Sequence, residues 1–304
     1  MNKSRFPSFS AELIGDLETR TGTLLEVVPI GGGMTNRNYR LEADHGVFML
    51  RLAGERTALL GINRDHEFAC ASIAHRVGVG VEAIAYLEPH AAILTRFIGA
   101  QTLSVQTARN HLERLVKTIE RYHQAPKFPS SFNPFQTVRN YHALALEFGV
   151  KFPEDVSLVL TQMTQIETTL QPHARECPCH NDLLPANLLF DGSSIFIVDW
   201  EYAGNGNPFF DLGNLAVNLE LDGAQCQELL RLYFGSSSPE LLAQLHLMRL
   251  ASDLREAFWG FLQAGISSIE FDFMEYAEKH LERFRQNIAM HEFKLWLRVL
   301  TAKT

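Results

Sequence analysis

The stretch that decides the fold is CHNDLLPANLLFDGSSIFIVDWE, which runs from residue 179 to residue 201. Two short apolar runs in it, residues 187–190 and 194–198, are separated by Asp191 and Gly192, which favour a tight turn. The runs are therefore expected to pair as two short strands. Pairing would bring the residues before the first strand close to those after the second.

Asp182, Asn187 and Asp199 carry oxygen-bearing side chains at these two ends. Pro185 disfavours a regular helix before the first strand, so a rigid loop is expected there. One carboxylate can take or orient the hydroxyl group of an acceptor, while an asparagine and a second aspartate can hold Mg²⁺ through oxygen. This set of side chains is suited to phosphoryl transfer.

The spacing of these residues is more informative than any one of them. A lone aspartate before a turn is usually a helix cap or part of an Asx-turn. Here His180, Asp182 and Asn187 follow the order H-x-D-x-x-x-x-N of kinase catalytic loops, and residues 199–201 stand where protein kinases have D-F-G. His180 is expected to brace the loop through hydrogen bonds, and Asp211 is expected to be structural as well.

The whole chain has the composition of a folded protein. Of its 304 residues, 46% are hydrophobic and 20% are charged, so a large core can form and disorder is excluded. The net charge of −8 argues against nucleic acid as a partner and is compatible with a cationic substrate. The N-terminus has no secretory apolar region and no segment is a transmembrane candidate, which predicts a cytoplasmic protein.

The four cysteines are too few and too irregularly spaced for a disulfide framework, and they are expected to be reduced and buried. Cys177, Cys179 and His180 could suggest a metal site. Because no second Cys/His pair stands at zinc-site spacing, no zinc site is expected.

Apolar patterning divides the chain into a strand-rich first part and a helical remainder. The expected strands are residues 24–30, 38–43, 47–53, 81–88 and 91–98, of which the last four form two hairpins. Between the hairpins, residues 64–77 are expected to form a helix that Asn63 caps.

Helical spacing dominates from Ser104 onward. Ser238 is expected to cap one later helix, and a capping box of Ser267 and Glu270 to open another. The predicted fold class is α+β with two lobes, a small antiparallel-sheet lobe and a larger helical lobe. Residues 1–98 are assigned to the nucleotide-binding lobe and residues 99–304 to the catalytic and acceptor-binding lobe.

A glycine-rich segment, GGGMTN at residues 31–36, joins two predicted strands. Backbone N–H groups without side-chain shielding can approach phosphate oxygens there, although an ordinary hairpin turn is an equal alternative. The candidate phosphate contacts are Gly32, Gly33, Thr35 and Asn36. Arg51 on a following strand favours phosphate binding, because a charge among apolar residues needs an anion. Glu67 could orient Arg51, or could be a solvated residue of its helix.

With these residues in hand, the chain resembles the choline/ethanolamine kinase family, within the aminoglycoside-phosphotransferase-like kinases. The likeness covers most of the chain, including GGGMTNRNYRL at 31–41, FMLRLAG at 48–54, HNDLLPANLLF at 180–190 and FWGFLQAGISSIEFDFMEYA at 258–277. The resemblance implies a protein-kinase-like fold that binds ATP between its lobes. It implies Asp182 as catalytic base and Asn187 with Asp199 as magnesium ligands. Adenine would lie near the connector residues Thr95, Phe97 and Ile98.

The same resemblance suggests a small amino-alcohol as the acceptor. A quaternary ammonium is held by aromatic faces, and Trp259 and Tyr276 match residues that line the choline pocket of the family. Their alternative interpretation is packing in helix cores. The chain departs from the family at Leu262, where a second tryptophan is expected, and at Asn218, where a carboxylate is expected.

Other functions are compatible with the same residues. The same catalytic core could act on another amino-alcohol, on thiamine or on an aminoglycoside. A nucleotide-binding pseudokinase scaffold is an alternative of another class, but Asp182, Asn187 and Asp199 are all retained, which argues against it. The sequence does not indicate an oligomeric state.

Overall fold

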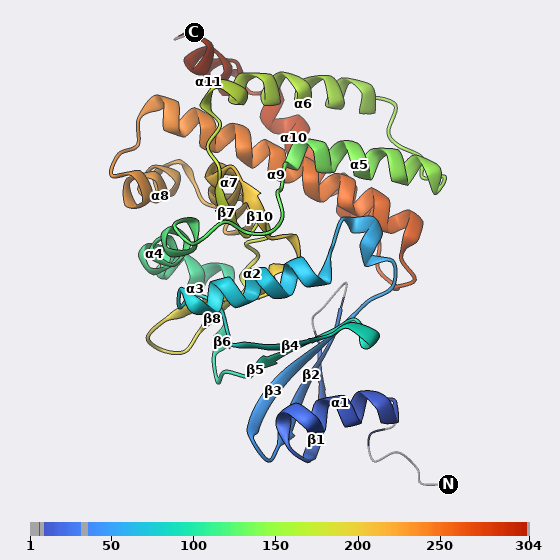
Figure 1. Ribbon diagram of the computed structural model, residues 1–304. Helices are drawn as coiled ribbons and strands as arrows, with labels where there is room; N and C mark the ends of the chain where they lie inside the picture. Colours follow the sequence, from blue (N-terminus) through green and yellow to red (C-terminus); the bar gives the residue numbers. More distant parts are fainter. Residues whose placement is uncertain (1–5, 7–8, 32–35, 303–304) are drawn as a thin grey trace.

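The computed structural model describes residue 6, residues 9–31 and residues 36–302. The chain forms a small N-terminal lobe and a larger helical lobe (Figure 1). The small lobe is built on an antiparallel sheet, so the predicted α+β fold class is confirmed.

The sheet of the small lobe has five strands in the order β1-β2-β3-β5-β4. Their bounds are β1 Leu24–Ile30, β2 Asn36–Ala43, β3 Gly46–Ala53, β4 Ala83–Leu87 and β5 Ala92–Arg96. The two predicted hairpins are present, and they join each other through β3 and β5. Because side chains alternate along β3, Phe48 and Leu50 face the apolar core while Arg51 lies on the opposite face.

A helix that was not predicted, α1 (Ala11–Thr21), covers the apolar face of this sheet. Ser10 caps it, with its hydroxyl accepting a bond from the backbone N–H of Leu13 at 3.1 Å. Leu13 and Leu17 of the helix and Leu24 of β1 are buried in the same core. The apolar stripe is short and weak, which is why spacing alone does not reveal the helix.

Helix α2 (Arg64–Arg76) lies between the sheet and the larger lobe (Figure 1). As predicted, Asn63 caps it, and its side-chain oxygen accepts a bond from the backbone N–H of His66 at 3.0 Å. The first turn of α2 buries two charged residues, Arg64 and Glu67. Both belong to the ionic network between the lobes described below.

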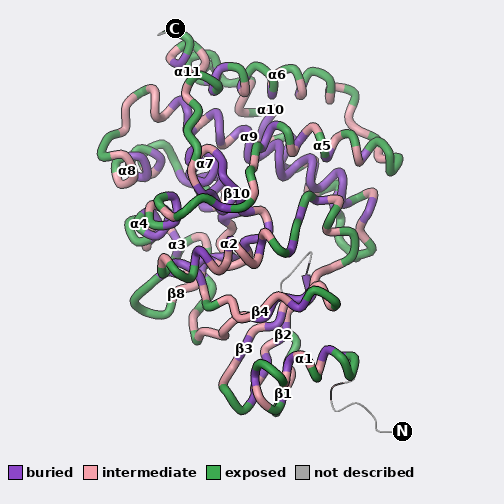
Figure 2. The backbone as a smooth tube through the Cα atoms, in the orientation of Figure 1, coloured by how far each residue is buried: buried purple, intermediate pink, exposed green. Residues whose placement is uncertain are grey.

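The larger lobe consists mainly of helices. They are α3 Val105–Asn110, α4 Leu112–His123, α5 Pro134–Glu147, α6 Val156–Leu170, α7 Pro208–Asn218, α8 Gly223–Phe234, α9 Pro239–Ile266, α10 Phe273–Ala289 and α11 His291–Thr301. Helix α9 has 28 residues and contacts α5, α6, α7, α8, α10 and α11. Residues 250–263 of this helix are all buried (Figure 2). Side chains from the middle of α9 therefore project into the interior of the lobe, toward the catalytic loop.

The predicted capping box of Ser267 and Glu270 is wrong. Ser267 is the C-cap of α9, and α10 begins later, at Phe273, where the side chain of Asp272 accepts a bond from the backbone N–H of Glu275 at 2.8 Å. Ser267 and Asp272 each stand three residues before a glutamate, so both match the pattern of a helix cap. Asp272 lies closer to the apolar stripe of the helix and is the actual cap.

Short strands interrupt the helices. The predicted pair is present as β8 (Leu188–Phe190) and β9 (Ile195–Ile197), and β6 (Gln101–Thr102) adds to it. A second pair, β7 (Cys177–Cys179) and β10 (Gly204–Gly206), was not predicted. Two or three residues are too few to produce a recognisable alternation of polar and apolar residues.

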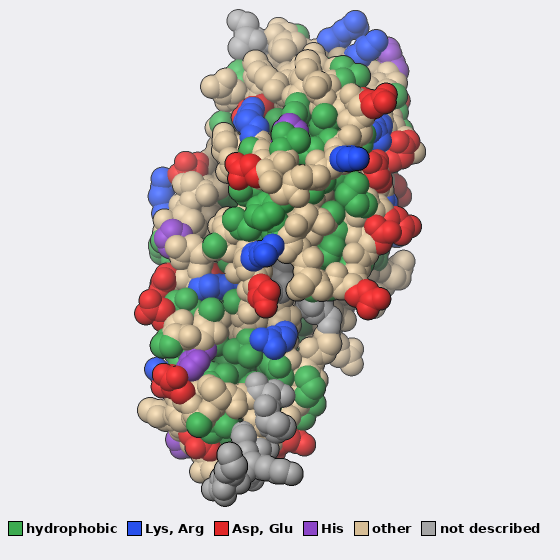
Figure 3. All heavy atoms as spheres, turned by 90° about the vertical axis from the view of Figure 1, so that its right-hand side faces the viewer, with side chains coloured by type: hydrophobic (Ala, Val, Ile, Leu, Met, Phe, Trp, Pro, Cys, Tyr) green, Lys and Arg blue, Asp and Glu red, His purple; other side chains and the backbone are tan. Residues whose placement is uncertain are grey.

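The connector between the lobes runs from the end of β5 to β6, and the boundary predicted after Ile98 falls within it. On the face shown in Figure 3, acidic and basic side chains are interspersed over both lobes. Among the residues described, no helix combines the length and the apolar character needed to span a bilayer.

Candidate active site

The catalytic loop follows β7 and is held from behind by Asp211, in the first turn of α7. Its two carboxylate oxygens accept the backbone N–H groups of His180 at 2.9 Å and Asn181 at 2.7 Å. Burial alone would raise the pKa of Asp211, but hydrogen bonds from His123 and Tyr122 hold that pKa below its ordinary value. An ionised carboxylate thus fixes the backbone just before Asp182.

His180 is bonded to backbone at both ring nitrogens. Its Nδ1 accepts the N–H of Asp182 at 3.2 Å, and its Nε2 lies 3.0 Å from the carbonyl oxygen of Val198. Since Nδ1 accepts, Nε2 carries the proton and donates it to that carbonyl. The ring therefore ties the catalytic loop to the segment before Asp199, and neither nitrogen is available to a substrate.

Asp182 is a buried residue of this rigid loop, with 8% of its area exposed. One carboxylate oxygen, Oδ1, accepts a bond from Arg255 at 2.7 Å, and the other, Oδ2, lies 3.4 Å from the amide nitrogen of Asn187. Burial raises the pKa of Asp182, and the positive charge of Arg255 opposes that rise. Arg255, on α9, was not singled out from the sequence because the two residues are far apart in the chain.

Asn187 and Asp199 lie at the same open end of the β8–β9 hairpin. The pairing of Leu188 with Ile197, and a bond of 3.0 Å from the N–H of Val198 to the carbonyl of Asn187, bring the two residues together. The amide nitrogen of Asn187 donates to the carbonyl of Asp182 at 2.9 Å, which leaves the amide oxygen for a cation. An amide oxygen and a carboxylate form a donor set that fits Mg²⁺.

Asp199 has a left-handed backbone conformation, with φ of 67°. Such conformations are unfavourable for residues other than glycine and are concentrated at functional sites. The turn directs the chain from β9 toward Trp200 and Glu201, so that Asp199 is presented between the lobes.

Arg51 connects the sheet of the small lobe to this aspartate. Its guanidinium group forms ion pairs with Glu67 of α2 and with Asp199. The side chain of Glu67 is fully buried, so of the two interpretations of Glu67 the solvated one is wrong. In this arrangement the positive charge of Arg51 compensates two carboxylates at the place where the lobes meet.

Replacement of Arg51 by alanine is expected to raise KM for ATP about tenfold and to lower kcat by a similar factor, because the expected phosphate contact and the partner of two carboxylates are lost. Arg51→Lys should restore only part of this loss, since an ammonium group lacks the planar fork. Steady-state kinetics against ATP measures both. Arg40→Ala, which removes a partly exposed arginine of β2, serves as the control. Unchanged ATP kinetics in Arg51→Ala would contradict a phosphate contact.

A second arginine ties the lobes together. Arg64 of α2 donates to Glu201 at 3.0 Å and to the side-chain oxygen of Asn36 at 3.0 Å, and it also pairs with Glu67. Asn36 in turn donates to Glu201 at 3.0 Å. Burial, and then the charge of Asp199, raise the pKa of Glu201. The side chain of Asn36, expected at phosphate, is thus part of this network between the lobes.

The other predicted nucleotide contacts are distributed as follows. Gly32, Gly33 and Thr35 lie outside the described residues. Thr95 is on β5 opposite Met49, and the backbone N–H of Phe97 donates to the carbonyl of Val47 at 3.1 Å. Ile98 follows in the connector between the lobes, and its role at the nucleotide stays a prediction.

Trp259 and Tyr276, from α9 and α10, pack against each other with ring centroids 5.6 Å apart. The indole nitrogen of Trp259 donates to the hydroxyl of Tyr202 at 3.1 Å, and the hydroxyl of Tyr276 donates to Glu256 at 2.7 Å. Glu256 was not singled out from the sequence. It stands three residues before Trp259 on α9, and side chains with this spacing are neighbours on the helix surface. The aromatic pair therefore has a carboxylate next to it.

Of the two departures from the family pattern, Leu262 is buried and Asn218 is half-buried. Leu262 is fully enclosed in the core of the larger lobe. The amide nitrogen of Asn218, at the end of α7, lies 3.3 Å from the carbonyl oxygen of Leu183. Glu256 is a carboxylate beside the aromatic pair, on a different helix from Asn218.

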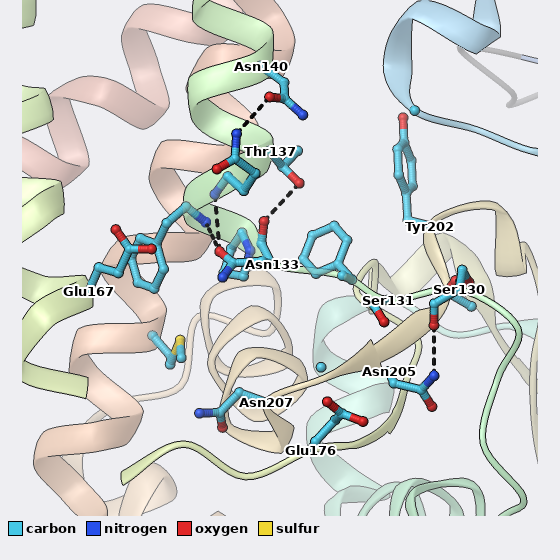
Figure 4. Close-up of a pocket in the computed structure, with 18 of the residues that line it drawn as sticks. Ser130, Ser131, Asn133, Thr137, Asn140, Glu167, Glu176, Tyr202, Asn205 and Asn207 are labelled. Atoms are coloured by element: carbon cyan, nitrogen blue, oxygen red, sulfur yellow. Dashed lines mark hydrogen bonds between the residues drawn. The ribbon is translucent and has the colours of Figure 1, made fainter. Parts of the chain in front are cut away.

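A cavity of about 900 Å³ lies elsewhere in the molecule. Figure 4 shows polar side chains around it, and Asp182, Asn187 and Asp199 are not among its lining residues. Several of these polar groups serve the fold, since Asn133 caps α5 and Asn205 donates to the carbonyl of Ser130 at 2.8 Å.

The thiols of Cys177 and Cys179 lie 3.8 Å apart, and the histidine beside them is His123, not His180. Both ring nitrogens of His123 are already bonded, Nδ1 to Tyr233 at 2.6 Å and Nε2 to Asp211 at 3.0 Å. A metal ion would have to displace one of these partners.

The chain is similar to known proteins over most of its length. The model of the phosphotransferase enzyme family matches residues 26–248. Protein LicA of Haemophilus influenzae is 29% identical over 211 residues, which are 66% of this chain and 61% of that protein. Probable choline kinase 1 of Arabidopsis thaliana is 24% identical over 313 residues, covering 90% of this chain and 88% of that one.

The similarity extends to solved structures. The crystal structure of a choline/ethanolamine kinase family protein from Mesorhizobium loti superposes with a TM-score of 0.80 and 28% identity, over 95% of this chain and 98% of that chain. The match covers both lobes, so the two-lobed α+β architecture is that of a known kinase-like fold.

Proposed function

This chain belongs to the phosphotransferase enzyme family, and we propose that it transfers the γ-phosphoryl group of ATP to the hydroxyl group of choline or ethanolamine. The observation that carries the proposal is the convergence of Asp182, Asn187 and Asp199 at one end of the β8–β9 hairpin, between the lobes. The names of the relatives, which include choline and ethanolamine kinases, support this acceptor class.

In the proposed reaction, the hydroxyl oxygen of the acceptor bonds to the γ-phosphorus of ATP, and Asp182 accepts the proton of that hydroxyl. The bond between the γ-phosphorus and the β–γ bridging oxygen breaks, and ADP leaves with that oxygen. Mg²⁺, held by Asn187 and Asp199, would neutralise charge on the phosphate oxygens when bound. Arg51 would bind a phosphate, and Glu67 holds its guanidinium group between the lobes. The loop bonds made by Asp211 keep Asp182 from moving during this step.

The acceptor would place its ammonium group against Trp259 and Tyr276. Aromatic faces attract a trimethylammonium group, and Glu256 adds a negative charge beside Tyr276. The aromatic pair and Asp182 share neighbours: Arg255 bonds Asp182 and lies over the Tyr202 ring, and the Tyr202 hydroxyl accepts from Trp259. A small amino-alcohol could therefore reach from the aromatic pair to the carboxylate.

A screen of ATP consumption tests the proposal. The purified protein, with Mg²⁺ and ATP, is offered choline, ethanolamine, thiamine and a panel of aminoglycosides, and acceptor-dependent release of ADP is measured. Choline or ethanolamine is expected to give the highest kcat/KM. Highest turnover with thiamine or an aminoglycoside would replace the acceptor, and nucleotide binding without turnover of any acceptor would favour a scaffold.

Trp259→Ala is expected to shift acceptor selectivity from choline toward ethanolamine by about tenfold in the ratio of kcat/KM values. The trimethylammonium group depends on aromatic faces, whereas a primary ammonium keeps three donors that can meet a carboxylate. Both acceptors are measured for the wild type, Trp259→Ala and Trp259→Phe, which retains an aromatic face and should be intermediate.

Trp296→Ala removes an indole from α11, where it stacks on His246, and provides the matched control. Its selectivity ratio should equal that of the wild type. If the ratio in Trp259→Ala is unchanged, or moves toward choline, Trp259 is a core residue and the ammonium group binds elsewhere.

A further inference from the structure

Arg255 is a buried arginine in the middle of α9, with 2% of its area exposed. Its Nη2 lies 2.7 Å from Oδ1 of Asp182, 2.9 Å from the carbonyl oxygen of Asn181 and 2.9 Å from Oε1 of Glu256. The guanidinium carbon stands 5.1 Å from the centroid of the Tyr202 ring. One nitrogen of this buried side chain thus donates both to the backbone carbonyl of Asn181 and to the carboxylate of Asp182.

This arrangement is costly for stability alone. Removing a guanidinium group from water carries a large penalty, and apolar residues of similar volume often stabilise a core as well or better. Among the residues that the structure describes, the buried Nε atom of Arg255 has no hydrogen-bond partner, so the side chain is not optimised for its own bonds. The bonds that it does make converge on residues 181 and 182.

The geometry distinguishes the two oxygens of Asp182. Arg255 holds Oδ1 at 2.7 Å, whereas Oδ2 has a long contact of 3.4 Å with Asn187. A carboxylate fixed through one oxygen has a defined rotamer, and its second oxygen points in a defined direction. Asp211 fixes the backbone of this loop from α7, and Arg255 fixes the side chain from α9.

We propose that Arg255 is a positioning residue for Asp182, which it holds through Oδ1 so that Oδ2 faces the hydroxyl group of the acceptor. The role rests on the proposed function, in which Asp182 is the base. Arg255 also forms an ion pair with Glu256, so Asp182, Arg255 and Glu256 make a carboxylate–arginine–carboxylate chain. Glu256 accepts a bond from the Tyr276 hydroxyl, which links this chain to the aromatic pair. The chain therefore connects the proposed acceptor cage to the base.

The test is a double-mutant cycle between the two residues. Arg255→Met is expected to lower kcat about 30-fold with less than about a twofold change in KM for ATP, because nucleotide contacts lie on the other lobe and on the hairpin. Arg255→Lys keeps a charge and should recover part of kcat. In an Asp182→Asn background, Arg255→Met should cost less than about threefold, since there is no base left to position.

Arg283→Met is the matched control, because Arg283 pairs with Asp253, a buried carboxylate of the same helix as Arg255. It should lower the melting temperature about as much as Arg255→Met but leave kcat unchanged. If Arg255→Met fails to fold, the same cycle is run with Arg255→Lys. Equal costs of the Arg255 change in both backgrounds, or parallel loss of kcat in Arg283→Met, would overturn the positioning role.

Failure of the inference can be told apart from failure of the proposed function. Wild-type turnover of an acceptor together with a large loss in Asp182→Asn supports the base. An additive cycle under those conditions then overturns only the role of Arg255. No acceptor turnover in the wild type, or wild-type turnover in Asp182→Asn, would overturn the proposed function and the positioning role with it.

Discussion

Asp182→Asn is expected to lower kcat about 10³-fold while KM for ATP changes by less than about twofold, because a positioned general base contributes roughly 10²–10⁴-fold to a proton transfer. Asparagine has nearly the same shape and can still contact Arg255 and Asn187, so the loop should keep its conformation. What is lost is the ability to take the proton. Steady-state kinetics with the best acceptor from the screen measures kcat, and nucleotide titration measures binding.

Asp191→Asn provides a control for this change. Asp191 is exposed in the turn between β8 and β9, where one carboxylate oxygen accepts the backbone N–H groups of Ser193 and Ser194. An asparagine side chain can accept the same bonds, so turnover should be unchanged. Near-normal turnover in Asp182→Asn would remove the assignment of Asp182 as base, whatever the acceptor.

Local patterns in the sequence were enough to predict the elements that hold the hairpin and the sheet. The turn at Asp191 and Gly192 and the apolar runs beside it predict β8 and β9, and Asn63 marks the start of α2. These signals work because a turn and a cap each depend on a few neighbouring residues. The same holds for the order of Asp182, Asn187 and Asp199.

Contacts between distant segments could not be predicted in this way. Arg255 reaches Asp182, and Arg64 reaches Glu201, across more than a hundred residues in the second case. A charged residue in a helical stretch is usually solvated, and only the folded chain reveals that these two are enclosed. The buried Glu256 beside Tyr276 could not be predicted for the same reason.

The resemblance to a kinase family compensated for part of this gap. It assigned Trp259 and Tyr276 to one pocket although they belong to different helices, and the two rings are indeed in contact. It also identified Asn218 as the position of a missing carboxylate, although the structure has a different carboxylate, Glu256, at the aromatic pair. Family patterns thus identify positions, whereas a carboxylate that reaches the same aromatic pair from another position becomes visible only in the folded protein.

Asp199 has two possible roles, so replacing it can show which of them matters for catalysis. Its carboxylate pairs with Arg51, and it is also the proposed ligand of Mg²⁺. These roles predict different responses to the metal. If Asp199 acts through Mg²⁺, its loss matters only when the metal is present; if it acts by holding Arg51, its loss matters in both cases.

Asp199→Ala is therefore expected to lower kcat/KM for ATP about 10²–10³-fold, since a ligand of the ion that stabilises the transferring group is lost. The affinity for Mg·ADP should fall, whereas the affinity for ADP with the metal chelated should stay the same or rise. The reason is that a negative charge near the phosphates has been removed and Arg51 is free to bind them. Calorimetric titration with and without Mg²⁺, on Asp199→Ala and Arg51→Ala, separates the two effects, because Arg51→Ala should weaken both complexes. An equal loss of affinity with and without Mg²⁺ in Asp199→Ala would mean that this aspartate serves Arg51 and the fold of the cleft, and that the metal is bound by other residues.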